Sequence, residues 1–281
     1  MKRTLVSFDW ALKGILREKA NFVVLSGLLT ELLGKKVTVY DILESESNVD
    51  NVDGKSNKLD LKAKIDDDEL AIFEVQVNRQ GDFFHRILYG TSNAVVEQLH
   101  KGDKFGKIRK VYSVDIVYFD LGKGSDYIYH GTTSFKGLHN RETLLLSDKE
   151  MKFLPHSVHG EQSVGALFPE YYLIYPNWFN GKIKNRIDEW VYALKTSTVE
   201  STFTAAGIQE LGEALDERKM TESERIAHED HIKYTRVKDS EIETAWEDGL
   251  IEGKVRGMAK VFELLEKGVS LDEAKKQLGI G

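Results

Sequence analysis

Two neighbouring segments in the first third of the chain alternate apolar and polar residues, which is the pattern of half-buried β-strands. In residues 58–65, KLDLKAKI, every second residue is apolar. In residues 69–78, ELAIFEVQVN, one face is apolar and the other carries polar groups in mid-strand. Three successive aspartates between the segments are typical of a turn. A hairpin that turns there brings Asp60 opposite Glu74.

The spacing of apolar residues predicts helices and further strands along the chain. We expect helices over 7–34 with a break near residue 20, over 81–100 and over 185–194, and strands over 37–43, 111–119, 127–135 and 167–175. The strands over 111–119 and 127–135 follow each other closely and predict a second hairpin. The helix over 81–100 is expected to bury a stripe made of Phe84, Ile87, Leu88, Val95 and Leu99.

The composition changes at about residue 203, where charged residues become more frequent and aromatic residues rarer. Helices are predicted over 204–220, 222–267 and 271–278. The alternation of strands and helices before this point indicates an α/β fold with a mixed sheet flanked by helices. We therefore expect an α/β domain over residues 1–195 and a helical C-terminal region over residues 196–281.

Composition and charge narrow the classes of function. Because the chain contains no cysteine, disulfides and cysteine-based zinc sites are excluded. No stretch approaches the roughly 20 apolar residues that a membrane span needs, so no membrane partner is expected and a cytoplasmic location is the default. The net charge of −7 argues against a surface that coats DNA by charge alone. A local basic patch remains compatible with DNA binding.

The facing pair Asp60 and Glu74 predicts a site for a divalent cation. Directly opposed residues of an antiparallel pair have Cβ atoms about 5 Å apart, and two carboxylates at that distance repel each other unless a proton or a cation lies between them. Mg²⁺ prefers oxygen ligands, binds through one or two carboxylates and keeps several waters. One such water can be activated to attack a phosphodiester.

Asp60 followed by Glu74-Val75-Gln76 on the next strand resembles the motif of the PD-(D/E)XK nuclease superfamily. The closest resemblance is to its transposase group, also described as recombination-promoting nucleases, in which glutamine replaces the usual lysine. Further similar segments are FDWALKGIL, LLTELLG, FFHRILYG, DEWVYALK and AWEDGLIEGKVRGM. In this chain Leu59 precedes Asp60, where the family name implies a proline.

The resemblance implies a restriction-endonuclease-like core and a metal-dependent endodeoxyribonuclease associated with recombination or transposition. Asp60 and Glu74 would bind Mg²⁺ or Mn²⁺, with the carbonyl of Val75 completing the ligand set. Gln76 would position the attacking water or the scissile phosphate, although it cannot supply the positive charge of a lysine. Asp9, in the first helix, is a candidate additional acid, or simply an aspartate favoured at a helix start.

Basic residues near this motif are candidates for contact with DNA phosphates. Arg86 lies on the helix that leaves the strand carrying Glu74, and its fork of donors suits a phosphate. The segment KGDKFGKIRK contributes Lys104, Lys107, Arg109 and Lys110, and it is either a phosphate-binding loop or a solvated surface loop.

Two other functions remain open. The chain could be a catalytically weak or inactive nuclease-fold protein that binds DNA or protein, with the helical tail as its interaction surface or as a homo-oligomer contact. Alternatively, the two carboxylates could serve a glycoside hydrolase. A glycoside hydrolase function would leave Gln76, Arg86 and the basic segment without a role.

Overall fold

The computed structural model describes residues 22–43, 60–77, 79, 81–152, 163–215 and 222–278. Asp9 lies outside these residues, so its role stays a prediction. The chain divides into two units, Met1–Lys219 and Met220–Gly281. Each is described by itself.

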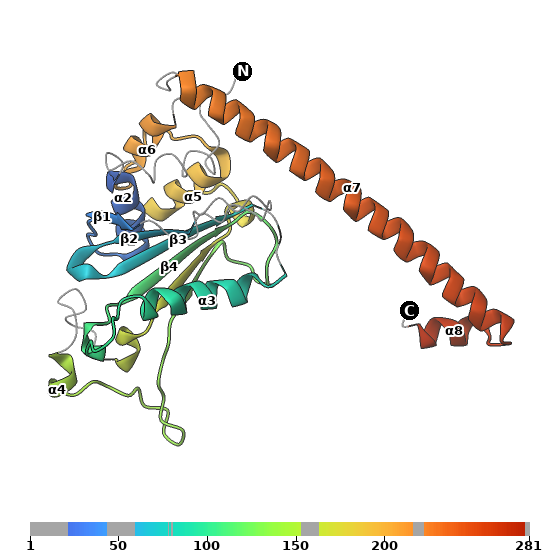
Figure 1. Ribbon diagram of the computed structural model, residues 1–281, viewed down its shortest axis with the longest axis horizontal. Helices are drawn as coiled ribbons and strands as arrows, with labels where there is room; N and C mark the ends of the chain where they lie inside the picture. The colour runs from blue at the N-terminus through green and yellow to red at the C-terminus, as the bar shows by residue number, and fades with distance from the viewer. Residues whose placement is uncertain are drawn as a thin grey trace. The chain divides into compact units, whose positions relative to one another are not determined.

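The first unit is built on a mixed sheet of six strands in the order β1-β2-β3-β4-β6-β5 (Figure 1). The strands are β1 (Asp41–Leu43), β2 (Asp60–Lys64), β3 (Leu70–Gln76), β4 (Val111–Val117), β5 (Ile128–Gly131) and β6 (Glu170–Ile174). Strands β3, β4 and β6 run parallel to one another, and the outer pairs are antiparallel. The prediction of an α/β fold with a mixed sheet flanked by helices is confirmed.

The hairpin of β2 and β3 has the register that the alternating pattern predicts. Asp60 pairs with Glu74, and Lys64 pairs with Leu70. The single 3-10 turn Asp66–Asp68 connects the strands. Asp68 has a φ of 62°, in the left-handed region that aspartate tolerates better than most residues. The acidic turn therefore fixes which residues face each other.

The second predicted hairpin, over 111–119 and 127–135, is wrong. Strand β6 lies between β4 and β5, pairing parallel with β4 and antiparallel with β5. Every residue of β4 is buried, as expected for a central strand with parallel neighbours and covered faces. The segment over 167–175, which includes β6, thus supplies an internal strand.

One face of the sheet is covered by α3 (Phe83–Val96), and α2 (Phe22–Leu33), α5 (Arg186–Thr196) and α6 (Ile208–Ala214) lie on the other side (Figure 1). Helix α2 contacts both α5 and α6. At Gly27 a Cβ atom would come within 2.1 Å of the carbonyl oxygen of Ala206, so only glycine permits this approach.

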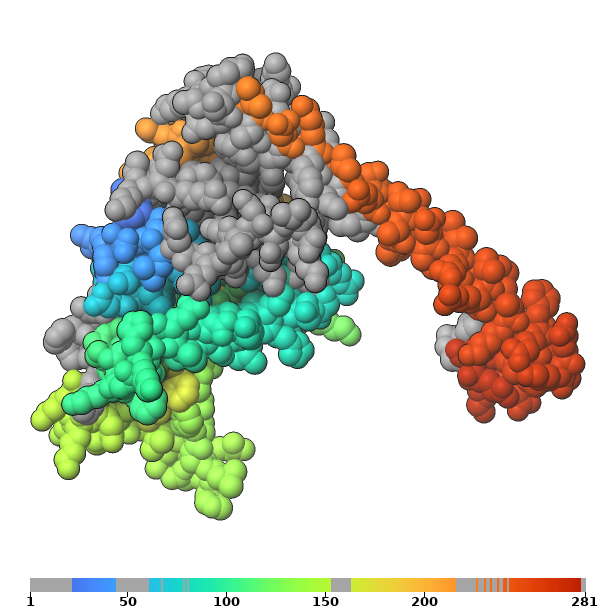
Figure 2. Space-filling model, in the orientation of Figure 1, coloured from blue at the N-terminus to red at the C-terminus, as the bar shows by residue number. Residues whose placement is uncertain are grey.

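Helix α3 buries only part of the predicted stripe, with Ile87 buried and Val95 partly buried. Phe83, Ile87, Thr91 and Ala94 face the sheet. Phe84 and Leu88 are 49% and 58% exposed, so their placement in the apolar stripe is wrong. The helix starts at Phe83, and its rotation is set by the contacts of Phe83 and Ile87 with the C-terminal ends of the strands. The outer side of α3 forms part of the surface in Figure 2.

The second unit contains α7 (Glu222–Glu266) and α8 (Leu271–Gln277). The Ser270 hydroxyl caps α8 by accepting a hydrogen bond from the backbone N–H of Glu273, at 3.3 Å. Ala274 of α8 is fully buried, and the two helices contact each other. Among the described residues, no helix combines the length and the apolar character required to cross a membrane.

Candidate active site

Three acidic residues occupy one register row across β2, β3 and β4. Glu74 pairs with Asp60 on one side and with Asp115 on the other. Side chains of residues paired in register project from the same face of a sheet. Leu70 and Ile72, which share the face of Glu74, pack against Ala94 of α3. The row therefore lies on the sheet face that α3 covers.

Glu74 is 7% exposed, and its charge is balanced from the helix above it. The Arg86 guanidinium donates through Nη2 to Oε1 of Glu74, and the Arg86 side chain is only 12% exposed. Two other nitrogens of Arg86, Nε and Nη1, are buried and have no hydrogen-bond partner among the described residues. Arg86 thus holds the carboxylate while retaining donors for a further acceptor.

Asp115 is the acid of the row that sequence reasoning missed. It is 1% exposed and accepts a hydrogen bond from the Ser113 hydroxyl at 3.0 Å. The charge of Asp115 also acts on Tyr171. Burial raises the pKa of Tyr171, a hydrogen bond with Thr91 partly lowers it, and the negative charge of Asp115 raises it further. The signal in the sequence was a single carboxylate inside the otherwise uncharged run VYSVDIV. A charge in a strand buried on both faces needs a partner or a role.

Gln76 lies on the same face as Glu74, one side chain further toward the end of β3, and is 8% exposed. Val75 points to the opposite face, because successive side chains of a strand alternate. The structure places the backbone of Asp60 in the row, and nothing is described of its side chain. The structure therefore brings together Glu74, Gln76 and Arg86 and sets Asp60 at the neighbouring register position.

The model of the family described as PD-(D/E)XK nuclease family transposase matches residues 6–163, more than half of the chain. The chain belongs to this family. The match includes β2, β3, β4 and α3, which carry the acidic row and Arg86. Comparisons with curated proteins and with solved structures gave no significant match.

Nucleases of the PD-(D/E)XK family generally use divalent metal ions, and the donors of the acidic row fit such an ion. Carboxylate oxygens on adjacent strands are the ligands that Mg²⁺ and Mn²⁺ prefer. Among the side chains that the structure describes, no three of His, Asp or Glu form a group that could hold a metal. Glu74 and Asp115 supply two carboxylates, so a third carboxylate ligand would have to come from Asp60 or from outside the described part.

The basic segment of this PD-(D/E)XK family member has two environments. Lys104 is exposed, and Lys107, exposed as well, forms an ion pair with Asp103. Lys110 is 4% exposed and forms an ion pair with Glu170 of β6. Because its ammonium is buried against the sheet, Lys110 is not at the surface where DNA phosphates would lie. We therefore leave it out of the proposed DNA contacts.

Proposed function

We propose that this PD-(D/E)XK family member is a metal-dependent endonuclease that hydrolyses DNA phosphodiester bonds during recombination or transposition. The observation that carries the proposal is the acidic row, with Asp60 in register with Glu74, and Glu74 in register with Asp115, beneath α3. Nothing in the packing of a sheet requires carboxylates at three adjacent central positions.

Each residue of the site has a distinct task in this proposal. Asp60 and Glu74 hold Mg²⁺ or Mn²⁺ with the carbonyl of Val75, and Asp115 adds a further negative charge beside Glu74. A bound divalent ion would supply positive charge at the scissile phosphate and would acidify a water there. Gln76 orients the water through its amide. The free donors of Arg86 bind phosphate oxygens, which carry increasing charge as the bond breaks.

A second candidate is a non-catalytic family member that binds DNA or protein. The observation that favours it is the ion pair between Arg86 and Glu74, because the guanidinium already neutralises this carboxylate without any metal. Metal affinity separates the two functions. A nuclease binds Mn²⁺ with an affinity that falls when Asp60 is replaced, whereas a protein that lost the chemistry shows no dependence on Asp60.

The test is nicking of supercoiled DNA by the purified full-length protein in Mg²⁺, Mn²⁺ or EDTA. We expect metal-dependent nicking, and a loss of at least 100-fold in Asp60→Asn and Glu74→Gln. Glu210→Gln is the matched control, since Glu210 is an exposed acid on α6, across the sheet. Nicking that persists in Asp60→Asn would contradict the assigned site, and no nicking under any condition would favour the binding protein.

We propose further that α7 pairs with α7 of a second copy. Five exposed apolar residues recur with the 4-3-4-3 spacing of a coiled-coil seam: Ile251, Val255, Met258, Phe262 and Leu265. Their exposed fractions range from 38% to 64%. An identical helix is the simplest partner for such a seam, because the same stripe supplies both sides of the contact.

A further inference from the structure

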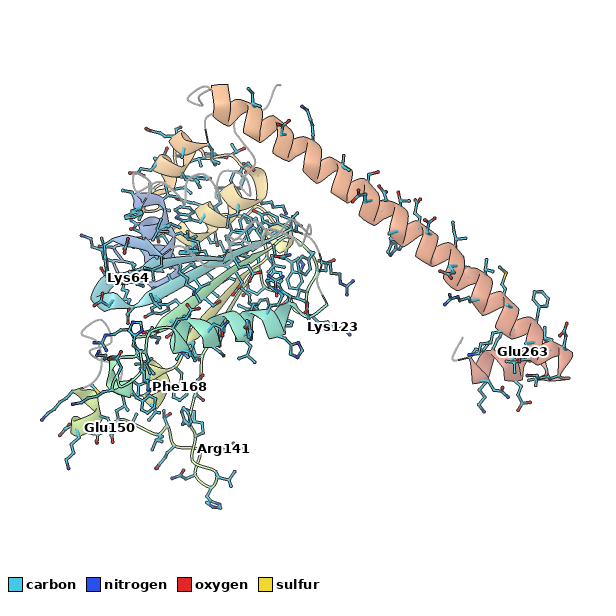
Figure 3. All side chains as sticks on the ribbon, viewed as in Figure 1. Lys64, Lys123, Arg141, Glu150, Phe168 and Glu263 are labelled. Carbon is cyan, nitrogen blue, oxygen red and sulfur yellow. The ribbon has the colours of Figure 1, made fainter. Side chains whose placement is uncertain are left out.

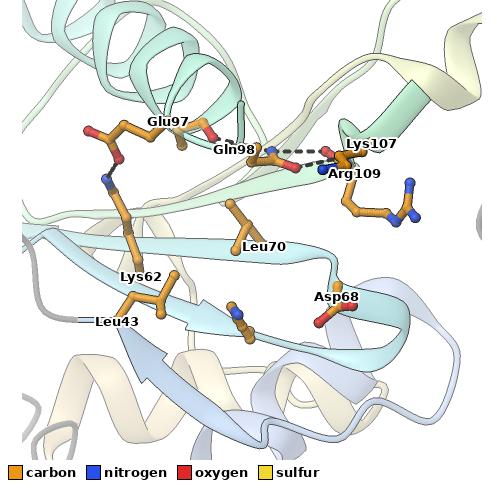
Figure 4. Close-up of a pocket in the computed structure, with 10 residues that line it drawn as sticks. Leu43, Lys62, Asp68, Leu70, Glu97, Gln98, Lys107 and Arg109 are labelled. Carbon is orange, nitrogen blue, oxygen red and sulfur yellow. Dashed lines mark hydrogen bonds and ion pairs between the residues drawn. The ribbon is translucent and has the colours of Figure 1, made fainter. Parts of the chain in front are cut away.

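A cavity of about 720 Å³ opens on the same sheet face as the acidic row, between the C-terminal end of α3, the hairpin of β2 and β3, and the basic segment (Figure 4). Four of its lining residues are cations, namely Lys62, Lys64, Lys107 and Arg109. Two are acids, Asp68 and Glu97. In an acidic protein, this excess of positive charge marks the cavity as a site for an anion.

The lysines of the cavity are available to a ligand. The ion pairs of Lys62 with Glu97 and of Lys107 with Asp103 both include an exposed partner, and such surface pairs contribute little to stability. Lys64, half-buried and labelled in Figure 3, has no ion pair among the described residues. A phosphate can therefore bind these side chains at little cost.

The wall of the cavity is fixed in place. The Gln98 side chain, near the end of α3, donates to the carbonyl of Arg109 at 3.1 Å and accepts from the Arg109 N–H at 2.7 Å. Leu70 and Ala94 form an apolar floor that belongs to the core. The basic segment is thus held against α3, and the cations are arranged before any ligand arrives.

Strand β2 links the wall of the cavity to the acidic row. Lys62 and Lys64 lie two and four residues from Asp60 and share its face of the sheet. With a rise of about 3.4 Å per residue, they stand about 7 and 14 Å from the row. DNA carries one phosphate per strand for about every 3.4 Å of helix axis, so these distances correspond to about two and four base pairs.

We propose that this cavity binds the backbone phosphates of the DNA strand whose scissile bond lies at the acidic row. The assignment of that strand rests on the proposed function. Lys62 and Lys64 contact phosphates of this strand that are about two base pairs apart, and Lys107 and Arg109 contact phosphates from the basic segment on the other side of the cavity. The DNA strand therefore runs along β2 beneath the end of α3.

Binding of a fluorescent DNA duplex, measured by anisotropy in EDTA across a range of NaCl concentrations, tests this site without any cleavage. The slope of log K against log salt is negative, and each lost phosphate contact reduces its magnitude by about 0.9. We expect this decrease for Lys64→Gln and for Lys107→Gln, and about twice as much for the double variant. The matched control is Lys36→Gln, an exposed lysine in the segment that links α2 to β1.

Unchanged slopes in both single variants would overturn the proposal, and the exposed Lys107 keeps the test valid should Lys64→Gln fold poorly. Displacement of DNA by inorganic phosphate below about 1 mM, at constant ionic strength, would instead identify a site for a free anion and would also overturn it. Reduced slopes together with absent nicking would retain the DNA site and remove the nuclease chemistry. Slopes equal to that of the wild type, together with metal-dependent nicking, would retain the nuclease chemistry and remove the DNA site.

Discussion

At the scale of single residues, the pairing of Arg86 with Glu74 explains how a row of acids can exist in a folded sheet. A buried carboxylate without a counter-charge is strongly destabilising, and here the guanidinium supplies that charge from α3. A metal ion bound to Glu74 would supply the same charge. Arg86 and the metal are therefore alternative partners of one carboxylate, which leaves Arg86 free for phosphate when the metal is present.

Replacement of Arg86 by Met tests this exchange. Removal of one partner of a buried ion pair costs about 3–5 kcal/mol, and we expect a decrease of that size in the free energy of unfolding in EDTA. Addition of Mn²⁺ is expected to recover much of it, because the ion takes over the charge of Glu74. Urea denaturation with and without Mn²⁺ measures both effects.

The matched control for Arg86→Met is Lys35→Met, which removes the lysine that forms an ion pair with the fully buried Glu69, away from the acidic row. It is expected to destabilise the protein equally in EDTA and in Mn²⁺. If Mn²⁺ stabilises Arg86→Met no more than it stabilises the wild type, the metal does not replace Arg86 as the partner of Glu74.

Asp115→Asn tests the acid that the sequence did not reveal. The substitution removes a charge beside Glu74 while keeping the shape of the side chain. We expect Mn²⁺ affinity, measured by calorimetry, to weaken at least tenfold, which is the usual size of such effects around metal ligands. Ser113→Ala removes only the hydroxyl donor to Asp115 and is expected to weaken affinity less. Equal Mn²⁺ affinity in Asp115→Asn and wild type would exclude a role for Asp115.

At the scale of elements, the local pattern of apolar and polar residues predicted those features that depend on residues close together in the sequence. The alternation in β2 and β3 and the acidic turn between them were sufficient for the register of Asp60 with Glu74. Asp115 and the position of β6 depend on parallel pairing between strands far apart in sequence, which alternation does not encode. The ion pair of Lys110 was not predictable for the same reason, since its partner Glu170 lies 60 residues away.

The ion pair between Lys110, which precedes β4, and Glu170 of β6 predicts a pH dependence of stability. Burial raises the pKa of Glu170, but the hydrogen bond and charge of Lys110, with hydrogen bonds from His130 and Tyr172, lower it more, so the net pKa lies below the ordinary 4.5. Stability from this group is present above the unfolded pKa and is lost as pH falls through the folded pKa.

We therefore expect Glu170→Gln to be less stable than wild type near pH 6 and the difference to shrink below about pH 4. Urea denaturation at a series of pH values measures it, with Glu210→Gln as the control that leaves the profile unchanged. A difference that stays constant from pH 6 to pH 3 would show that Glu170 does not contribute through its charge.

At the scale of the whole molecule, the two units differ in how they satisfy their apolar residues. The first buries an apolar core between the sheet and its helices, whereas the apolar stripe of α7 in the second is exposed. The sequence indicated the extent of these helices, but it did not reveal an exposed apolar stripe on α7. Such a stripe is costly to leave in water, which favours its burial between two copies.

The double variant Val255→Glu/Phe262→Glu places charges in the middle of the seam of α7. We expect the wild type to be a dimer and the variant a monomer in light scattering coupled to size-exclusion chromatography, because like charges at facing core positions oppose association. Lys254→Glu/Arg256→Glu changes charge on the same turns outside the seam and is expected to remain dimeric. A monomeric wild type at micromolar concentration, or a dimer in both variants, would mean that the stripe has another occupant.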